Sequence, residues 1–140
     1  MRWLLLAILA IFSLAPPLAA HESRPAYLDV REFAAGQYEV LWKRPMRGEY
    51  VIGFAVDWPE GCAPRATNES QVPGASITRI LLDCGNTGLV GGTITIDRLA
   101  ETSAEVLVRV EFADGTSQTQ LLRPASPSMT VAGPRSALAV

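Results

Sequence analysis

Residues Glu105 to Arg123 read EVLVRVEFADGTSQTQLLR, and this stretch decides the fold class. From Glu105 to Phe112 apolar and charged residues alternate, which is typical of a strand with one buried face. Asp114-Gly115 follows, a dipeptide that strongly favours a two-residue hairpin turn, and Thr116 to Arg123 forms the return segment. The stretch predicts a β-hairpin whose first strand turns these side chains towards the core: Val106, Val108, Val110 and Phe112.

The segments before and after this hairpin repeat the pattern of short strand and turn. Tyr27 to Phe33 and Gln37 to Lys43 both alternate, and Ala34-Ala35-Gly36 between them favours a turn. Tyr50 to Val56 is apolar on both faces, which predicts a central strand. Further strands are expected at Ser76 to Asp83, Leu89 to Ile96 and Met129 to Val131.

Seven to eight short strands separated by turns, without helical periodicity after residue 20, predict an all-β domain. Their number and spacing favour an antiparallel, immunoglobulin-like β-sandwich. Asp57 to Gly74 is expected to be a long loop instead, because its prolines remove backbone donors from regular structure.

The first twenty residues are typical of a secretory signal peptide. Met1 and Arg2 give a positive start, Trp3 to Leu14 is a short apolar run, and Ala15 to Ala20 contains two prolines and ends in small residues. The apolar run is shorter than the roughly 20 residues that span a bilayer comfortably. We therefore expect export to the periplasmic or extracellular side of the membrane, with a mature domain over residues 21–132. An uncleaved amino-terminal anchor is the alternative.

The charge of the chain is small and mixed. The 140 residues include 12 basic and 14 acidic side chains, and removal of the leader takes one arginine away. The remaining 11 basic and 14 acidic residues give a formal net charge of −3, which argues against a nucleic-acid partner. It also argues against direct electrostatic binding of the mature domain to anionic lipid.

The two cysteines, Cys62 and Cys84, are expected to form a disulfide, because an even number in an exported chain favours one. Their spacing matches no metal site and no Cys-x-x-Cys redox motif. The bond would pin the long loop that contains Cys62.

The residues that carry catalysis in other proteins are scarce in this sequence. The single histidine, His21, lies at the expected mature terminus, so no Ser-His-Asp set is available. The glycines from Gly85 to Gly92 lie between expected strands and are read as turns. We therefore expect no enzyme and no cofactor.

His21 gives one alternative. A terminal histidine offers its α-amino nitrogen and a ring nitrogen to one copper or nickel ion, and Glu22 can add an oxygen. Against this stands the ordinary interpretation, a solvated terminus whose histidine merely follows the cleavage site.

The segment from Trp42 to Gly48 is the candidate for an interface. Arg44 to Glu49 is expected to be a polar loop, so that several cations and an exposed methionine lie together. The alternative is a solvated loop without a partner. The candidate interface residues are Trp42, Lys43, Arg44, Met46 and Arg47.

Several of these segments together resemble a known family. They are His21 to Leu28, Tyr38 to Pro45 with Arg47-Gly48, Cys62, Cys84 with Gly88-Leu89, Ile96 to Leu99, Val106 to Arg109, Ala113 to Gly115, and Pro127 to Val131. The pattern is similar to the exported amino-terminal region of HupE/UreJ-like membrane proteins.

In that family the region precedes a multi-helix membrane domain that is presumed to move nickel or a similar metal. The resemblance therefore implies a membrane transporter domain as partner. The sequence departs from the family where that domain would begin, and transport activity is not carried over. Residues 133–140 are read as a linker or as the start of a membrane region.

Overall fold

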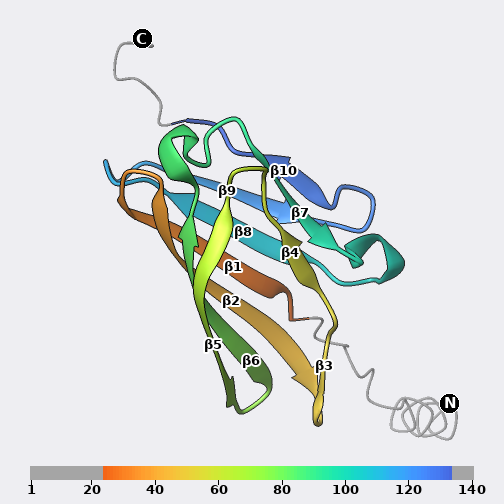
Figure 1. Cartoon of the computed structure of the whole chain (residues 1–140). Coiled ribbons are helices and arrows are strands. Elements are labelled where there is room, and N and C mark those ends of the chain that lie inside the picture. The colour runs from red at the N-terminus through yellow and green to blue at the C-terminus, as the bar shows by residue number, and fades with distance from the viewer. Residues whose placement is uncertain (1–23, 134–140) are drawn as a thin grey trace, which may run out of the picture.

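Residues 24–133 are described by the computed structural model, and they form two β-sheets that pack face to face (Figure 1). The larger sheet has the order β5-β6-β2-β1-β8-β9, and β3 pairs with the end of β2. Its strands are β1 (Ala26–Ala34), β2 (Gln37–Arg47), β3 (Tyr50–Val51), β5 (Ala63–Val72), β6 (Ala75–Asp83), β8 (Val106–Glu111) and β9 (Ser117–Leu122). The smaller sheet has the order β10-β7-β4, with β4 (Ala55–Asp57), β7 (Thr93–Asp97) and β10 (Ser128–Thr130).

The all-β class is confirmed. The helical elements of the described part are two 3₁₀ turns, Gly85–Thr87 and Leu99–Glu101. The ten strands exceed the seven to eight expected, because Tyr50 to Val56 is divided between β3 and β4 and because β5 lies in the expected loop. The immunoglobulin-like topology stays a prediction.

One pairing departs from the wholly antiparallel arrangement. β1 pairs antiparallel with β2 but parallel with β8, from Ala26 opposite Val106 to Arg31 opposite Glu111. Parallel neighbours need a long connection, and here the chain between them includes the strands of the smaller sheet. Side chains alternate in the same way in parallel and in antiparallel strands, so the sequence pattern could not predict that β1 and β8 pair in parallel.

The first strand of the hairpin that decided the fold class, β8, turns its inward-facing side chains into the core, whereas β9 is an edge strand of the larger sheet. Val106, Val108 and Val110 are fully buried, and Phe112 is nearly so. They pack in one cluster with side chains of both sheets, among them Leu28, Val30, Tyr38, Val40, Trp42, Ile94, Ile96 and Met129. The alternation predicted for Tyr27–Phe33 and Gln37–Lys43 is confirmed by this burial.

The long loop predicted over Asp57–Gly74 is wrong, because β5 occupies Ala63–Val72. All ten of its residues are exposed, so neither face gives the alternation that predicts a strand. β5 is an edge strand that pairs only with β6, and its register shifts between Pro64 and Ala66. Proline is tolerated at such an edge and bulge.

Three other segments also differ from expectation. β2 continues to Arg47, so the loop predicted to start at Arg44 is strand as far as Arg47. Tyr50 to Val56 is no central strand: its first residues form β3 on the larger sheet and its last form β4 on the smaller one. The segment therefore closes one side of the sandwich. The strand expected from Leu89 begins only at Thr93.

The described chain begins and ends at opposite ends of the sandwich (Figure 1). Arg24 lies beside the end of β2, whereas Gly133 lies near Val90. Among residues 24–133, no helix is both long and apolar enough to cross a membrane. The expected signal peptide, His21 and Glu22 lie outside the described residues.

Candidate functional site: an open hollow at the end of the sandwich

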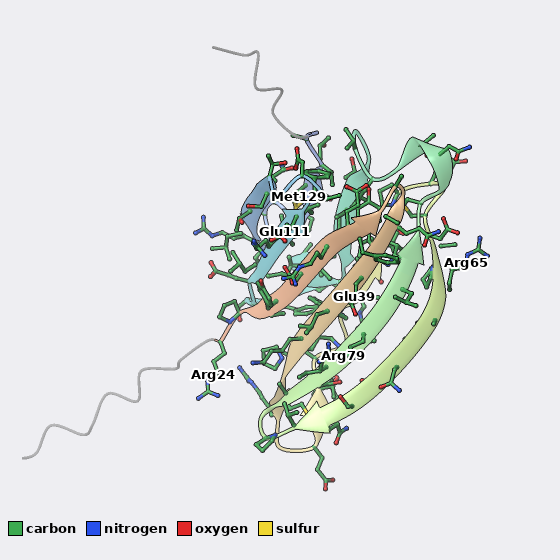
Figure 2. The ribbon with its side chains drawn as sticks, turned by 90° about the vertical axis from the view of Figure 1, so that its left-hand side faces the viewer. Arg24, Glu39, Arg65, Arg79, Glu111 and Met129 are labelled. Atoms are coloured by element: carbon green, nitrogen blue, oxygen red, sulfur yellow. A yellow bond between two sulfur atoms is a disulfide. The ribbon has the colours of Figure 1, made fainter. Side chains whose placement is uncertain are left out.

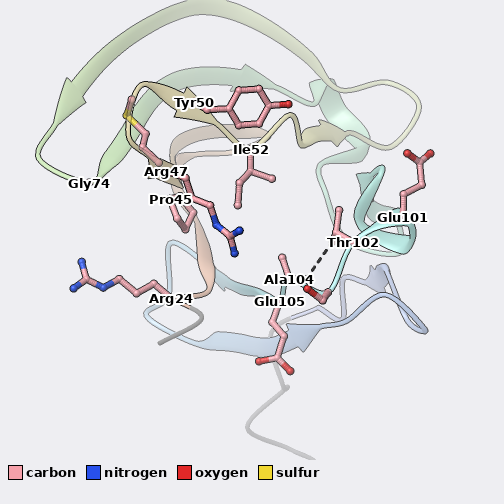
Figure 3. A pocket seen from close by; sticks show the side chains of 12 residues that line it. Arg24, Pro45, Arg47, Tyr50, Ile52, Gly74, Glu101, Thr102, Ala104 and Glu105 are labelled. Atoms are coloured by element: carbon pink, nitrogen blue, oxygen red, sulfur yellow. Dashed lines mark hydrogen bonds between the residues drawn. The ribbon is translucent and has the colours of Figure 1, made fainter. Parts of the chain in front are cut away.

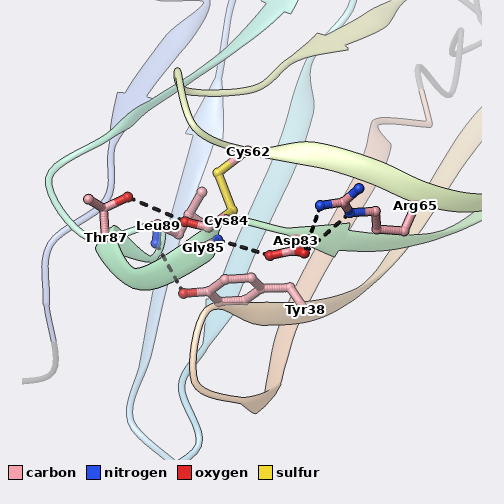
Figure 4. Close-up of a disulfide and its surroundings, with 8 residues drawn as sticks. All are labelled: Tyr38, Cys62, Arg65, Asp83, Cys84, Gly85, Thr87 and Leu89. Carbon is pink, nitrogen blue, oxygen red and sulfur yellow. Dashed lines mark hydrogen bonds and ion pairs between the residues drawn. A yellow bond between two sulfur atoms is a disulfide. The ribbon is translucent and has the colours of Figure 1, made fainter.

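Cys62 and Cys84 form the predicted disulfide, with their Cα atoms 3.9 Å apart (Figure 4). The sequence led us to expect that the bond pins a long loop, and the structure shows that it does not. It joins the residues next to the Ala63–Asp83 pair, where β5 begins and β6 ends. It therefore closes the base of the β5–β6 hairpin.

Hydrogen bonds fix the turn that follows Cys84. The Gly85 N–H donates to the Asp83 carboxylate at 2.9 Å, and the Arg65 side chain donates to the same group. The Gly85 bond, followed by Arg65, holds the pKa of Asp83 below its usual value. The Leu89 N–H donates to the buried Tyr38 hydroxyl at 3.1 Å, and burial raises the pKa of that phenol. These hydrogen bonds stabilise the turn between Cys84 and Leu89.

The predicted interface residues separate, because they lie on a strand and not on a loop. Side chains of a strand alternate between its two faces. Trp42 points into the core and is only 4% exposed, so its assignment to an interface is wrong. Lys43 and Arg47 are exposed, whereas Met46 is half-buried and so not the fully exposed methionine expected.

Arg44 is engaged within the protein and is not available to a partner. Its guanidinium forms an ion pair with Glu69 at 2.9 Å and donates to the Thr78 hydroxyl at 3.4 Å. The Ser76 hydroxyl donates to the same Glu69 oxygen at 2.6 Å. The cluster joins β2, β6 and β5 where they extend past the smaller sheet, which removes Arg44 from the candidate interface.

Of the three remaining residues, Met46 and Arg47 line a hollow of about 700 Å³ at the end of the sandwich (Figure 3). One wall is the β2–β3 hairpin, with Tyr50 and Ile52. The opposite wall is the segment from Glu101 to Glu105, which leads into β8. Ile52 and Ala104 lie at the base of the two walls and pack against the core, so the floor of the hollow is apolar.

A second hollow of about 200 Å³ adjoins the first. Both are lined by Arg24, Pro45 and Gly74, and the second also contains Lys43 and Tyr27. The Arg47 guanidinium points into the larger hollow, and the Tyr50 ring lies on the same wall (Figure 3). Tyr50 is 72% exposed, the highest value among the large apolar side chains of the described chain.

The acidic groups of the larger hollow already have basic partners. Glu105 accepts from Arg123 at 3.0 Å, and Glu101 lies 3.5 Å from Arg98. By contrast, no described carboxylate pairs with Lys43 or Arg47. Lys43 and Arg47, the charged lining residues of the two hollows that have no acidic or basic partner among the described residues, are therefore both positive.

The outer face of β1 and β8 is different, because the charges there satisfy one another. Asp29 on β1 lies 3.4 Å from Arg31 and 3.5 Å from Arg109 on β8. Glu111, which is labelled in Figure 2, completes the network by contacting both Arg109 and Arg31. A surface neutralised in this way attracts a charged ligand less than the end hollow does.

Sequence reasoning missed half of the hollow. Arg24, Tyr50, Ile52 and the segment from Glu101 to Glu105 were not singled out, although Met46 and Arg47 were. Tyr50 and Ala104 lie more than fifty residues apart in the sequence, and no local pattern indicates that they meet. The one usable signal was an aromatic residue directly after the Gly48-Glu49 turn.

The described residues contain no group of three His, Cys, Asp or Glu side chains that could hold a metal ion. The proposed copper or nickel ligands, His21 and Glu22, lie outside the range 24–133 and stay a prediction.

No family model matches the chain, and no curated protein does. The resemblance to the exported region of HupE/UreJ-like proteins therefore also stays a prediction.

Proposed function

We propose that this chain is an exported, non-enzymatic accessory domain that binds a partner protein through the end hollow. The observation that carries the proposal is the combination of an apolar floor with an exposed aromatic and an exposed arginine on its rim. Tyrosine and arginine are the residue types most enriched at the centres of protein interfaces. The β2–β3 hairpin holds both in place, since Arg47 pairs with Tyr50 across the two strands.

The partner we propose is a membrane transporter domain, as the resemblance to HupE/UreJ-like proteins implies. Two features support this placement. The leader-like residues 1–20 would bring the domain to the outer side of the membrane. The disulfide suits an oxidising compartment.

The test is copurification of the tagged full chain with membranes dissolved in a mild detergent. We expect recovery of an integral membrane protein with several helices, identified by mass spectrometry. Tyr50→Ser should reduce that recovery several-fold, because it removes the exposed ring from the rim of the hollow.

Phe33→Ser is the matched control. Phe33 is also an exposed aromatic, at 57%, but it lies near the other end of β1. Seven residues separate it from Ala26, which is about 23 Å along a strand. Recovery that depends on Phe33 and not on Tyr50 would contradict the proposed surface, and recovery of only non-membrane proteins would contradict the proposed partner.

A further inference from the structure

We infer that the two adjoining hollows bind an acidic, extended polypeptide segment, whose carboxylates pair with Lys43 and Arg47. This inference rests on the proposed function and specifies the chemistry that the partner would present. The described parts of the chain supply no acidic group to either side chain. A ligand that reaches both would therefore bring the missing negative charge.

The shape of the site favours an elongated ligand. The larger hollow, of about 700 Å³, contains Arg47, and the smaller one, of about 200 Å³, contains Lys43. They meet at Arg24, Pro45 and Gly74, which line both. Because Lys43 and Arg47 lie in different hollows, they suit a polypeptide that carries negative charges at spaced positions.

The walls also determine how such a segment is recognised. Pro25, Pro45 and Pro73 line the smaller hollow, and proline has no backbone N–H to donate. A ligand that bound as an additional β-strand would therefore meet few main-chain N–H donors in the smaller hollow. Recognition falls to the charged side chains, and a guanidinium and a carboxylate make charge-assisted hydrogen bonds of about twice the usual strength.

Apolar side chains of the same segment have a place between the charges. Ile52 and Ala104 form the apolar floor of the larger hollow, and the Tyr50 ring lies on the same side of it as Ile52 (Figure 3). A segment in which apolar and acidic residues alternate would place the apolar ones on this floor. The inferred ligand is thus an acidic and apolar stretch of a partner protein.

The probe is a fluorescent peptide of alternating leucine and aspartate, with both termini blocked so that only side-chain carboxylates carry charge. Its binding to the full chain, as purified after export, is followed by fluorescence anisotropy at low ionic strength. The comparison peptide has asparagine in place of every aspartate. We expect it to bind at least about tenfold more weakly, because it cannot form the ion pairs.

Arg47→Gln and Lys43→Gln should each weaken binding of the aspartate peptide several-fold. Arg79→Gln is the matched control for Arg47→Gln: it removes the same charge from the exposed outer face of β6. Arg79 lies opposite Leu41, six residues from Arg47, or about 20 Å along β2. Binding should also fall steeply at about 1 M salt, where the Debye length is about 3 Å.

Equal affinity for the two peptides, equal loss with Arg79→Gln and Arg47→Gln, or no binding at all would overturn the inference. The membrane copurification is read separately. Failure of the peptide with Tyr50-dependent copurification intact overturns this inference alone. Peptide binding without any membrane partner overturns the proposed function alone.

Discussion

Removal of the disulfide should cost this domain a large part of its stability. Cys62 and Cys84 are 22 residues apart, and closing a loop of that length lowers the entropy of the unfolded chain by an amount worth about 3 kcal/mol. The described domain has about 110 residues, for which unfolding gains roughly 0.23 kcal/mol per kelvin. The midpoint of thermal unfolding should therefore fall by about 13 °C.

The assay is urea unfolding of the full chain, followed by the fluorescence of buried Trp42, for the protein with and without reductant. Reduction keeps both sulfur atoms in place and so isolates the cross-link. The double variant Cys62→Ala, Cys84→Ala should lose somewhat more, because Cys84 is buried and its sulfur packs in the core.

A loss under about 1 kcal/mol on reduction would refute the loop-closure reasoning. It would mean that pairing of β5 with β6 keeps the two cysteines close even when the rest of the chain unfolds. A large loss in the double variant alone would assign the effect to packing.

The other predictions concern the core, a tight turn, acid stability and the amino terminus. Val108→Asp should prevent folding, because a buried carboxylate at a fully enclosed position has no partner; circular dichroism should then lose its β-sheet signal, and a cooperative unfolding transition would contradict the assignment. Gly36→Ala should destabilise by more than about 2 kcal/mol, since a Cβ there meets the Gly85 carbonyl oxygen at 2.0 Å in addition to the positive φ. Gly115→Ala, with positive φ but open space, should lose only about 1–2 kcal/mol in the same urea experiment, and equal losses would exclude the close approach as the cause. The pKa of Asp83 is lowered in the folded state, so its contribution to stability is present above the unfolded value of 3.8 and is lost as pH falls through the folded value. Asp83→Asn should therefore flatten the decline of stability below about pH 4, and an unchanged pH profile would exclude this carboxylate as the origin. If the mature chain begins at His21, copper(II) should bind it better than nickel(II), and one residue added before His21 should abolish binding; equal copper affinity by calorimetry for both termini would leave the histidine without a metal role.

The sequence predicted the elements that have one buried face. Glu105–Phe112, Tyr27–Phe33 and Gln37–Lys43 all alternate, and alternation follows from burial on one side of a pleated sheet. The disulfide was also predictable from two cysteines and a leader.

Prediction from the sequence failed for segments that have no buried face and for segments whose buried face changes along their length. β5 is exposed on both faces, so the prolines in and around it indicated a loop. Tyr50 to Val56 crosses from one sheet to the other, which its continuous apolar character concealed. The parallel pairing of β1 with β8 depends on long-range packing, which no local pattern encodes.

The candidate site was predictable only in part, for the same reason. Met46 and Arg47 were recognised because charge and sulfur stand together in one segment. Trp42 was included wrongly although it lies within the strand predicted over Gln37–Lys43, and Arg44 was included because that strand had been taken to end before it. The opposite wall, around Ala104, joins the site through tertiary structure alone.

The most direct test of the account is photo-crosslinking in intact cells from a benzophenone side chain placed at position 50 or at position 33. Both positions carry exposed aromatic residues, and they lie at opposite ends of the sandwich. We expect position 50 to form a crosslink to one integral membrane protein and position 33 to form none. The same crosslink from position 33, with none from position 50, would contradict the assignment of the end hollow as the surface that binds a partner.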